Sequence, residues 1–319
     1  MTFERQQRLH SPTGATLNLL VALPAEAPRA IVQINHGLAE HAARYARFAS
    51  FLTSRGFAVY VHDHRGHGHT SAPDAPLGSF GKEPALDKVM DDVLAVHDLI
   101  ASEHPGTPVI VFGHSMGALI ALNFVSRHPR SVAGAAIWNA TLSAGLAGRA
   151  AQAVLAWERF RLGSDVPSRM MPKLTFATWG NQVSDGRTAF DWLSRDHDEV
   201  DRYVADPLCG WDASVGMWKA IFDLIFQAAD ERNFDAVPRD MPFHLVGGGM
   251  DPSTGRGKVV EGLATRMRRT GFSNLVSTIY PQNRHESLNE LNRDLIMADF
   301  ADWAERQVVV RTRNDAESS

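Results

Sequence analysis

The sequence has little cysteine, no excess of positive charge and no long apolar run, and each of these absences excludes a class of protein. Of its 319 residues only Cys209 is a cysteine, so no internal disulfide can form, and this fits a reducing compartment. Lysine and arginine number 32 against 36 acidic residues, and the resulting net charge of −4 argues against a nucleic-acid-binding protein. No apolar run approaches the roughly 18 residues that cross a bilayer, and residues 1–8 lack the apolar stretch of a secretory signal. We therefore expect a soluble, cytoplasmic protein.

Apolar residues are not scarce, since they make up 44 % of the chain, enough for a sizeable core. Short continuous apolar runs alternate with stretches in which apolar residues recur every third or fourth position. Buried strands that alternate with helices are typical of a parallel sheet covered by helices on each side. The strands are expected at 30–35, 57–61, 109–112, 132–138, 243–246 and 275–280, and the helices at 41–55, 86–100, 256–270 and 286–309. The expected fold class is therefore α/β, with a mostly parallel central sheet flanked by helices.

Residues 141–240 interrupt this alternation. Helical patterns dominate there, without a clear buried strand, and strand character resumes afterwards. We therefore expect a helical lid inserted between two core strands. The core is then divided into residues 1–140 and 241–310, and a polar, disordered tail is expected at 311–319.

Residues 113–117 read Gly-His-Ser-Met-Gly and lie between an expected strand and an apolar helical pattern. In that context G-x-S-x-G is typical of a nucleophile elbow, a sharp turn that lifts one serine hydroxyl out of a sheet. Side chains at Gly113 and Gly117 would strike the neighbouring strand and helix, and strained backbone is expected at the apex. We predict Ser115 as the nucleophile, and the alternative is an ordinary strand-to-helix turn.

A serine nucleophile needs a histidine base, which in turn needs a carboxylate to hold its tautomer. At a nucleophile elbow the order along the chain is serine, acid, histidine, with each residue after a strand. Asp251 and His285 follow the last two expected strands, so we predict that both meet Ser115 at the carboxyl edge of the sheet. Asp251 precedes a proline, and an aspartate there is also typical of a simple turn, so Asp240 and Asp230 are kept as weaker candidates for the acid.

The oxyanion that forms during acyl transfer needs hydrogen-bond donors. One is expected from the backbone N–H of Met116, the residue after the nucleophile, and the other from the loop after the strand at 30–35. We predict the Leu38 N–H there, because Gly37 lets the backbone approach closely. The alternative is that His36 and Gly37 merely end the strand.

Four segments form a specific pattern when they are taken together. They are His36-Gly37-Leu38-Ala39-Glu40-His41-Ala42-Ala43-Arg44-Tyr45, Asp63-His64-Arg65-Gly66-His67-Gly68, the elbow Gly113–Gly117 and Arg284-His285-Glu286. Together they resemble the monoacylglycerol lipase and lysophospholipase branch of the serine α/β-hydrolases, from about residue 10 to 305, and residues 206–210 are similar to its lid region. The resemblance implies the α/β-hydrolase fold and hydrolysis of acyl esters. It also implies the five site residues already reached, which are Ser115, Asp251, His285, Leu38 and Met116.

Other functions stay open at this point. The histidine run at 62–69 invites a metal site, but Gly66 stands where the H-x-H-x-D-H order of β-lactamase-type metallo-hydrolases has its aspartate. The fold also hosts binding proteins that have lost part of the triad, whereas this chain keeps all three residues. A carboxylate nucleophile, as in dehalogenases and epoxide hydrolases, is excluded by Ser115. Thioesterase, acyltransferase, peptidase and haloperoxidase activities use the same triad and therefore stay open. We expect a hydrolase that needs neither a metal nor a cofactor.

The substrate is expected to depend on the inserted helices. Their apolar and aromatic residues favour a pocket for an acyl chain, or else form the core of the lid itself. These residues are Leu155, Phe160, Leu174, Phe176, Trp179, Phe190, Trp192, Trp218, Phe222 and Phe226. The expected partner is a small acyl ester, and the lid is expected to make transient contact with membranes or micelles. Acyl length, head group and oligomeric state stay open.

Overall fold

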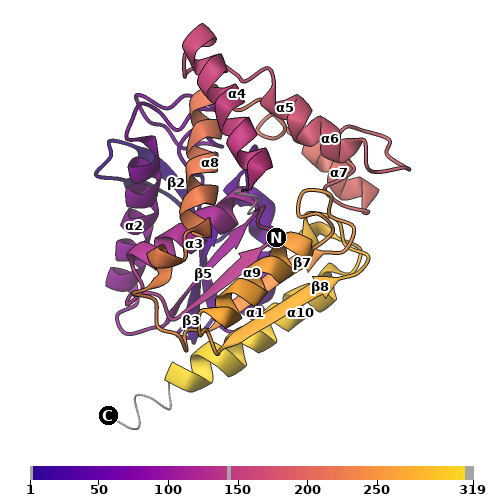
Figure 1. Cartoon of the computed structure of the whole chain (residues 1–319). Coiled ribbons are helices and arrows are strands. Elements are labelled where there is room, and N and C mark those ends of the chain that lie inside the picture. The colour runs from indigo at the N-terminus through magenta and orange to yellow at the C-terminus, as the bar shows by residue number, and fades with distance from the viewer. Residues whose placement is uncertain (1–2, 142–144, 313–319) are drawn as a thin grey trace.

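The computed structural model describes residues 3–141 and 145–312. These residues form one sheet of eight strands with helices on both of its faces (Figure 1). The strand order is β1-β2-β4-β3-β5-β6-β7-β8, and all neighbours from β4 to β8 across the sheet are parallel. The strands are β1 (Arg5–His10), β2 (Thr16–Ala22), β3 (Ala30–Asn35), β4 (Phe57–His62), β5 (Val109–His114), β6 (Gly134–Trp138), β7 (Phe243–Gly248) and β8 (Leu275–Tyr280). The α/β class with a mostly parallel sheet is confirmed.

The hairpin of β1 and β2 is absent from the sequence prediction. Both strands are antiparallel to their neighbours, and β1 forms one edge of the sheet. The residues of β1 alternate between half-buried and exposed, so this polar strand carries little hydrophobic signal. Gly14 has a φ of +83° in the turn that joins the two strands.

Helices cover both faces of the sheet, as predicted. On one face α2, α3 and α9 share a core that also includes α8. On the other face α1 and α10 pack against the sheet, where Phe48 and Phe300 contact Phe112 and Trp138. These helices are α1 (Ala46–Ser54), α2 (Ala85–Glu103), α3 (Met116–Arg127), α9 (Lys258–Arg269) and α10 (Arg293–Ala304).

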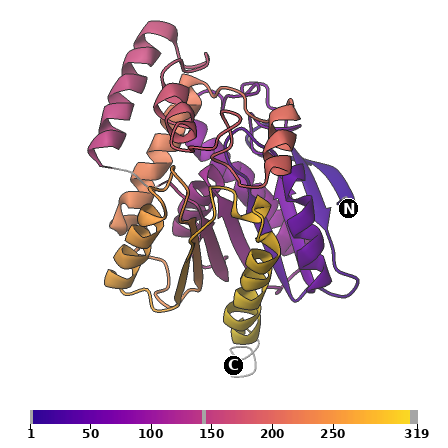
Figure 2. The same cartoon turned by 90° about the vertical axis from the view of Figure 1, so that its right-hand side faces the viewer.

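The chain between β6 and β7, the β6–β7 connection, consists of helices joined by irregular segments and adds no strand to the sheet among its described residues. It contains α4 (Leu146–Leu162), α5 (Met171–Leu174), α6 (Phe176–Gly180), α7 (His197–Ala205), α8 (Val215–Ala229) and η2 (Glu231–Phe234). Figures 1 and 2 both show α4 to α7 above the sheet. The helix α8 differs from these, because it packs along α3 and belongs to the core of the sheet domain.

Two of the expected helices are interrupted in the structure. The helix expected at 41–55 begins as η1 (Ala42–Tyr45) before α1, and the one expected at 286–309 is divided into η3 (Ser287–Asn289), α10 and η4 (Glu305–Val309). The tail expected at 311–319 lies outside the described residues from residue 313 onward. None of the described helices combines the length and apolar character that a bilayer crossing requires.

Candidate active site

Ser115 lies at the turn between β5 and α3, where the elbow pattern predicts it. Its φ of +55° and ψ of −119° are rare for a residue other than glycine, and such strained backbone marks functional turns. A Cβ on Gly113 would lie 2.1 Å from the Gly117 carbonyl oxygen, and one on Gly117 would lie 2.0 Å from that of Asn35. Only glycine fits at these two positions, because both approaches are to rigid backbone.

Asp251 and His285 follow the carboxyl ends of β7 and β8 and are bonded to each other. The His285 Nδ1 lies 2.9 Å from the Asp251 Oδ2, and the two side chains are 3 % and 0 % exposed. Burial alone would raise the pKa of Asp251, but the charge of His285 and hydrogen bonds from neighbouring side chains hold that pKa below its usual value. The weaker candidates Asp230 and Asp240 pair instead with arginines, away from His285.

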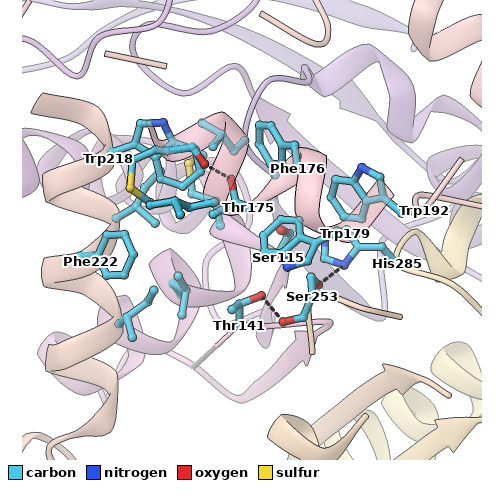
Figure 3. Close-up of a pocket in the computed structure, with 18 of the residues that line it drawn as sticks. Ser115, Thr141, Thr175, Phe176, Trp179, Trp192, Trp218, Phe222, Ser253 and His285 are labelled. Atoms are coloured by element: carbon cyan, nitrogen blue, oxygen red, sulfur yellow. Dashed lines mark hydrogen bonds between the residues drawn. The ribbon is translucent and has the colours of Figure 1, made fainter. Parts of the chain in front are cut away.

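Ser115 and His285 line the same cavity, and Figure 3 shows them next to each other. Asp251 and Ser253 occupy the Nδ1 side of the His285 ring, so Nε2 is the nitrogen left for the serine. No hydrogen bond joins Ser115 to His285 among the described residues, and bonds of this kind often tighten only when substrate is bound. The structure thus brings the three predicted residues to one place.

The loop after β3 brings the two predicted oxyanion donors to the serine. A Cβ on Gly37 would lie 3.4 Å from the Ser115 Cβ, so the backbone of this loop passes beside the nucleophile. Leu38 and Met116 line the same cavity as Ser115. Within the described part of the chain, the Leu38 N–H donates to no backbone carbonyl. Met116 is the first residue of α3, where an N–H has no partner one turn back.

Four charged side chains form a charged cluster beside the triad: Glu40, Arg44, His114 and Glu286. Arg44 donates to Glu40 at 2.6 Å and to both carboxylate oxygens of Glu286 at 2.6 and 2.7 Å. The His114 Nδ1 lies 3.5 Å from Glu40, and its Nε2 donates to the His285 carbonyl at 3.0 Å. His114 is therefore committed to a structural role, in agreement with its position next to the nucleophile at a sharp turn.

The charged cluster keeps its charges in spite of burial. Burial would raise the pKa of Glu40, but His114 and Arg44 hold that pKa well below its usual value. Burial would likewise raise the pKa of Glu286, and the Arg44 charge lowers it. Burial would lower the pKa of His114, but the hydrogen bond and charge of Glu40 raise it. Glu40 also accepts from the Gly37 N–H at 2.5 Å, which connects the cluster to the oxyanion loop.

The histidine run at 62–69 packs behind the same loop. The His36 ring lies 4.5 Å from that of His64, and the His62 ring 4.6 Å from His64, measured between centroids. His36 donates from Nδ1 to the Gly37 carbonyl and accepts at Nε2 from the His64 backbone N–H. Among the described residues, the one group of three side chains whose ligand atoms lie within 4.8 Å is His41, Asp206 and Cys209, outside this run. The run therefore supports the oxyanion loop.

An apolar cavity of about 590 Å³ opens beside Ser115 and His285. Seven of the ten predicted pocket residues line it, together with Ala151 and Ile221, and these nine form the apolar wall. The seven are Leu174, Phe176, Trp179, Phe190, Trp192, Trp218 and Phe222. Leu155 and Phe226 pack in the core instead, and Phe160 is 90 % exposed on α4. Both interpretations of this residue set, pocket and core, are therefore correct in part.

Sequence reasoning missed Ser253 and Asn139, which both bond to the Asp251 carboxylate. The Ser253 hydroxyl donates to Oδ1 at 2.7 Å, and the Asn139 amide donates to Oδ2 at 3.1 Å. Asn139 follows β6 directly and has a φ of +50°. Two signals were available: Asp-Pro-Ser is typical of a turn in which the aspartate bonds two residues on, and a polar residue at a strand end belongs to the edge where sites form.

Comparison with known proteins agrees with this geometry. A family model described as serine aminopeptidase, S33, matches residues 26–292. The monoacylglycerol lipase of Mycolicibacterium smegmatis is 27 % identical over 281 residues, which cover 88 % of this chain and 89 % of that protein. Human monoglyceride lipase is 29 % identical over 229 residues, 72 % of this chain and 67 % of that protein.

A solved structure supports the fold. The thermostable carboxyl esterase from Bacillus coagulans superposes with a TM-score of 0.86 over 97 % of this chain and 99 % of its own, at 22 % identity. The family match spans most of the chain, and the eight-stranded sheet with its elbow has the corresponding architecture. The chain therefore belongs to the serine aminopeptidase S33 family of the α/β-hydrolase fold, and it is a carboxylic ester hydrolase.

Proposed function

We propose that this chain hydrolyses acyl esters of the monoacylglycerol or lysophospholipid type through an acyl-enzyme intermediate. The observation that carries the proposal is the apolar cavity of about 590 Å³ beside Ser115 and His285. Burial of an acyl chain there is favourable by about 0.8 kcal/mol for each CH₂ group. Two relatives, from Mycolicibacterium smegmatis and human, are named as lipases of monoacylglycerols.

In this mechanism Ser115 attacks the ester carbonyl while the His285 Nε2 takes the hydroxyl proton. Asp251 holds the imidazole and stabilises the imidazolium, and the backbone N–H groups of Leu38 and Met116 bind the oxyanion. The bond between the carbonyl carbon and the alcohol oxygen breaks as His285 returns the proton to the leaving alcohol. Water, deprotonated by His285, then releases the fatty acid and regenerates the serine.

The division into a core of residues 1–140 and 241–310 and a lid of residues 141–240 is part of the proposal. Within the lid, we propose that α4 to α6 move, because α8 contributes more side chains than they do to the core shared with α3, where α4 and α5 add only Leu155 and Met171 among the described residues. The apolar wall takes residues from α4 to α6, from α8 and from the segment between α6 and α7. Movement of α4 to α6 would therefore open the cavity while α8 keeps its place.

We further propose that α4 makes transient contact with membranes or micelles. Leu146 is 88 % exposed and Phe160 90 % exposed, and the Arg161 guanidinium lies 5.0 Å from the centre of the exposed Trp157 ring. Apolar and basic side chains on one exposed helix favour a lipid–water interface. A cytoplasmic location stays a prediction, which the single buried, unpaired Cys209 supports.

Peptidase activity is the alternative that the family description raises. An aminopeptidase must bind a substrate ammonium group, for which an unpaired carboxylate is the natural partner. The carboxylates that line the cavity, Glu40 and Glu286, are both bound to Arg44. The cavity therefore favours an uncharged acyl chain, while thioesters and acyl transfer to alcohols are compatible with the same site.

The test combines active-site labelling with a substrate panel. A fluorophosphonate should label the wild type and fail to label Ser115→Ala, whose turnover should fall at least about 10⁴-fold. The panel pairs monoacylglycerols and lysophosphatidylcholines of graded acyl length with an acyl thioester and an aminoacyl anilide. We expect kcat/KM to rise with acyl length and the anilide to be inert. Equal labelling of both proteins would refute the nucleophile assignment, and preferential anilide cleavage would refute the substrate class.

A further inference from the structure

The Asp251 carboxylate is fully satisfied by hydrogen bonds, and Ser253 supplies two of them. Its Oδ1 accepts from the Ser253 backbone N–H at 2.9 Å and from the Ser253 hydroxyl at 2.7 Å. Its Oδ2 accepts from Asn139 at 3.1 Å and faces the His285 Nδ1 at 2.9 Å. The amide of Asn139 is itself oriented by Ser287, whose hydroxyl donates to its oxygen at 3.1 Å.

The same Ser253 hydroxyl also touches the base. Its Oγ lies 2.9 Å from the His285 Nδ1, the distance that separates Asp251 from this nitrogen. The residue is 6 % exposed and lines the cavity, so the contact lies inside the site. Figure 3 shows Ser253 and His285 joined by this hydrogen bond.

The location of the protons decides what this contact does. A hydroxyl has one proton, and an ionised carboxylate can only accept, so the Ser253 proton points to the Asp251 Oδ1. Toward His285 the Ser253 oxygen must then act as an acceptor. The proton on Nδ1 is therefore shared between Asp251 Oδ2 and Ser253 Oγ, which leaves Nε2 unprotonated and able to accept the proton of Ser115.

We infer that Ser253 is a positioning residue that fixes the tautomer of His285 and stabilises its imidazolium by accepting from Nδ1–H. If its hydroxyl turned to donate to Nδ1 instead, the imidazole proton would move to Nε2 and the base would be lost. The bond to Asp251 prevents this, because a charged acceptor binds the hydroxyl proton more strongly than a neutral ring nitrogen. This inference rests on the proposed function, since it assumes the roles of Ser115, Asp251 and His285.

The experiment compares Ser253→Ala with Ser253→Thr, which restores the hydroxyl. We expect Ser253→Ala to lower kcat about 10- to 100-fold, the effect of losing a hydrogen bond to a charged group, with KM within twofold, and Ser253→Thr to recover most of kcat. In a boronic acid complex, where His285 is protonated, the Nδ1–H proton resonance should move downfield in Ser253→Ala because the proton is no longer shared. Ser168→Ala is the matched control, since that buried hydroxyl donates to Glu158 at 2.5 Å and touches no triad residue.

Three results would be decisive against these assignments. Wild-type kcat and an unmoved resonance in Ser253→Ala would overturn the inference. A loss of activity that follows only the unfolded fraction, as judged against Ser168→Ala, would overturn it as well. Turnover by Ser115→Ala at the wild-type rate would overturn the proposed function itself, so the two failures are distinguishable.

Discussion

The apolar wall and three members of the charged cluster, Glu40, His114 and Glu286, line one cavity and are held by different forces. In the cluster, Glu40, Arg44, His114 and Glu286 are buried and paired at distances between 2.6 and 3.5 Å. The wall is held by contacts between apolar side chains, such as the Trp179 and Trp192 rings at 4.9 Å. Hydrogen bonds constrain both distance and angle, whereas apolar contacts have no preferred direction. The triad and the oxyanion loop thus lie beside the hydrogen-bonded cluster, and the proposed acyl chain lies against the apolar wall.

The comparison is tested most strongly by removing the central cation of the cluster. Arg44→Met leaves Glu40 and Glu286 buried without their partner, and we expect the free energy of unfolding to fall by about 3–5 kcal/mol. Urea denaturation measures this change. Arg127→Met is the matched control, because its pair with Asp87 lies at the surface and should contribute about 0–1 kcal/mol. Equal decreases in the free energy of unfolding of the two variants would show that the buried cluster contributes no more to stability than a surface ion pair.

A second prediction concerns pH and the histidines behind the oxyanion loop. Burial lowers the pKa of His62 to about 3, and neither of its ring nitrogens has a hydrogen-bond partner within the described part of the chain. Between an unfolded pKa of about 6.5 and this value, the unfolded chain binds a proton that the folded protein does not. Stability is therefore lost as pH falls below about 6.5, and His62 alone accounts for about 2 kcal/mol of that loss at pH 5.

His62→Phe provides the measurement for the pH prediction. It removes the titrating group and keeps a ring of similar shape at a fully buried position. The free energy of unfolding should decline less between pH 7 and pH 5 in this variant than in the wild type. An identical decline in both proteins would place the pH sensitivity elsewhere.

The apolar wall is tested by filling the cavity. Ala151 lines it from α4, so Ala151→Phe should shorten the space for an acyl chain. We expect kcat/KM for a palmitoyl ester to fall at least about tenfold, which is about 1.4 kcal/mol, while that for a butyryl ester changes little. Ala153→Phe is the matched control, because Ala153 is exposed on the same helix. A uniform loss for both esters would mean that the cavity does not hold the acyl chain.

The smallest effect is expected on the outer face of α4. Phe160→Ser should weaken binding to anionic phospholipid vesicles about fivefold, the effect of losing partial burial of an aromatic ring. Turnover of a short, water-soluble ester should not change, because Phe160 is 90 % exposed and lies outside the cavity. Leu295→Ser, at an exposed position of α10, is the control for general loss of surface hydrophobicity. If both substitutions weaken vesicle binding equally, α4 is not the contact surface.

Most of the central sheet was predictable because burial leaves a continuous apolar pattern in its strands, although the buried strand β2 was missed. The strands β3 to β7 are buried on both faces, and each matches an expected strand to within a few residues. The edge strand β1 was not found because half of its residues face water and carry no apolar signal. The sequence also could not show that α8 packs on α3, because its helical period would be the same if it packed on the other inserted helices.

The candidate site was predictable to the extent that chemistry demands an order of residues along the chain. Ser115, Asp251 and His285 follow strand ends in the order that the mechanism requires. The partners Ser253 and Asn139 escaped prediction, because a serine or an asparagine at a turn is common and only its neighbours give it a role. Glu40 and Arg44 were part of a visible motif, yet the bond from Arg44 to Glu286, 242 residues away along the chain, could not be predicted from the sequence.

The sequence by itself determined the α/β pattern, the elbow and the identity of the three residues that can perform serine chemistry, because these depend on local periodicity and on residue type. Only the tertiary structure decided which side chains meet across the sheet, since contacts between distant segments depend on how the whole chain packs. That packing divides the aromatic residues between a cavity wall and a core, and it joins Ser253 to both members of the Asp251–His285 pair.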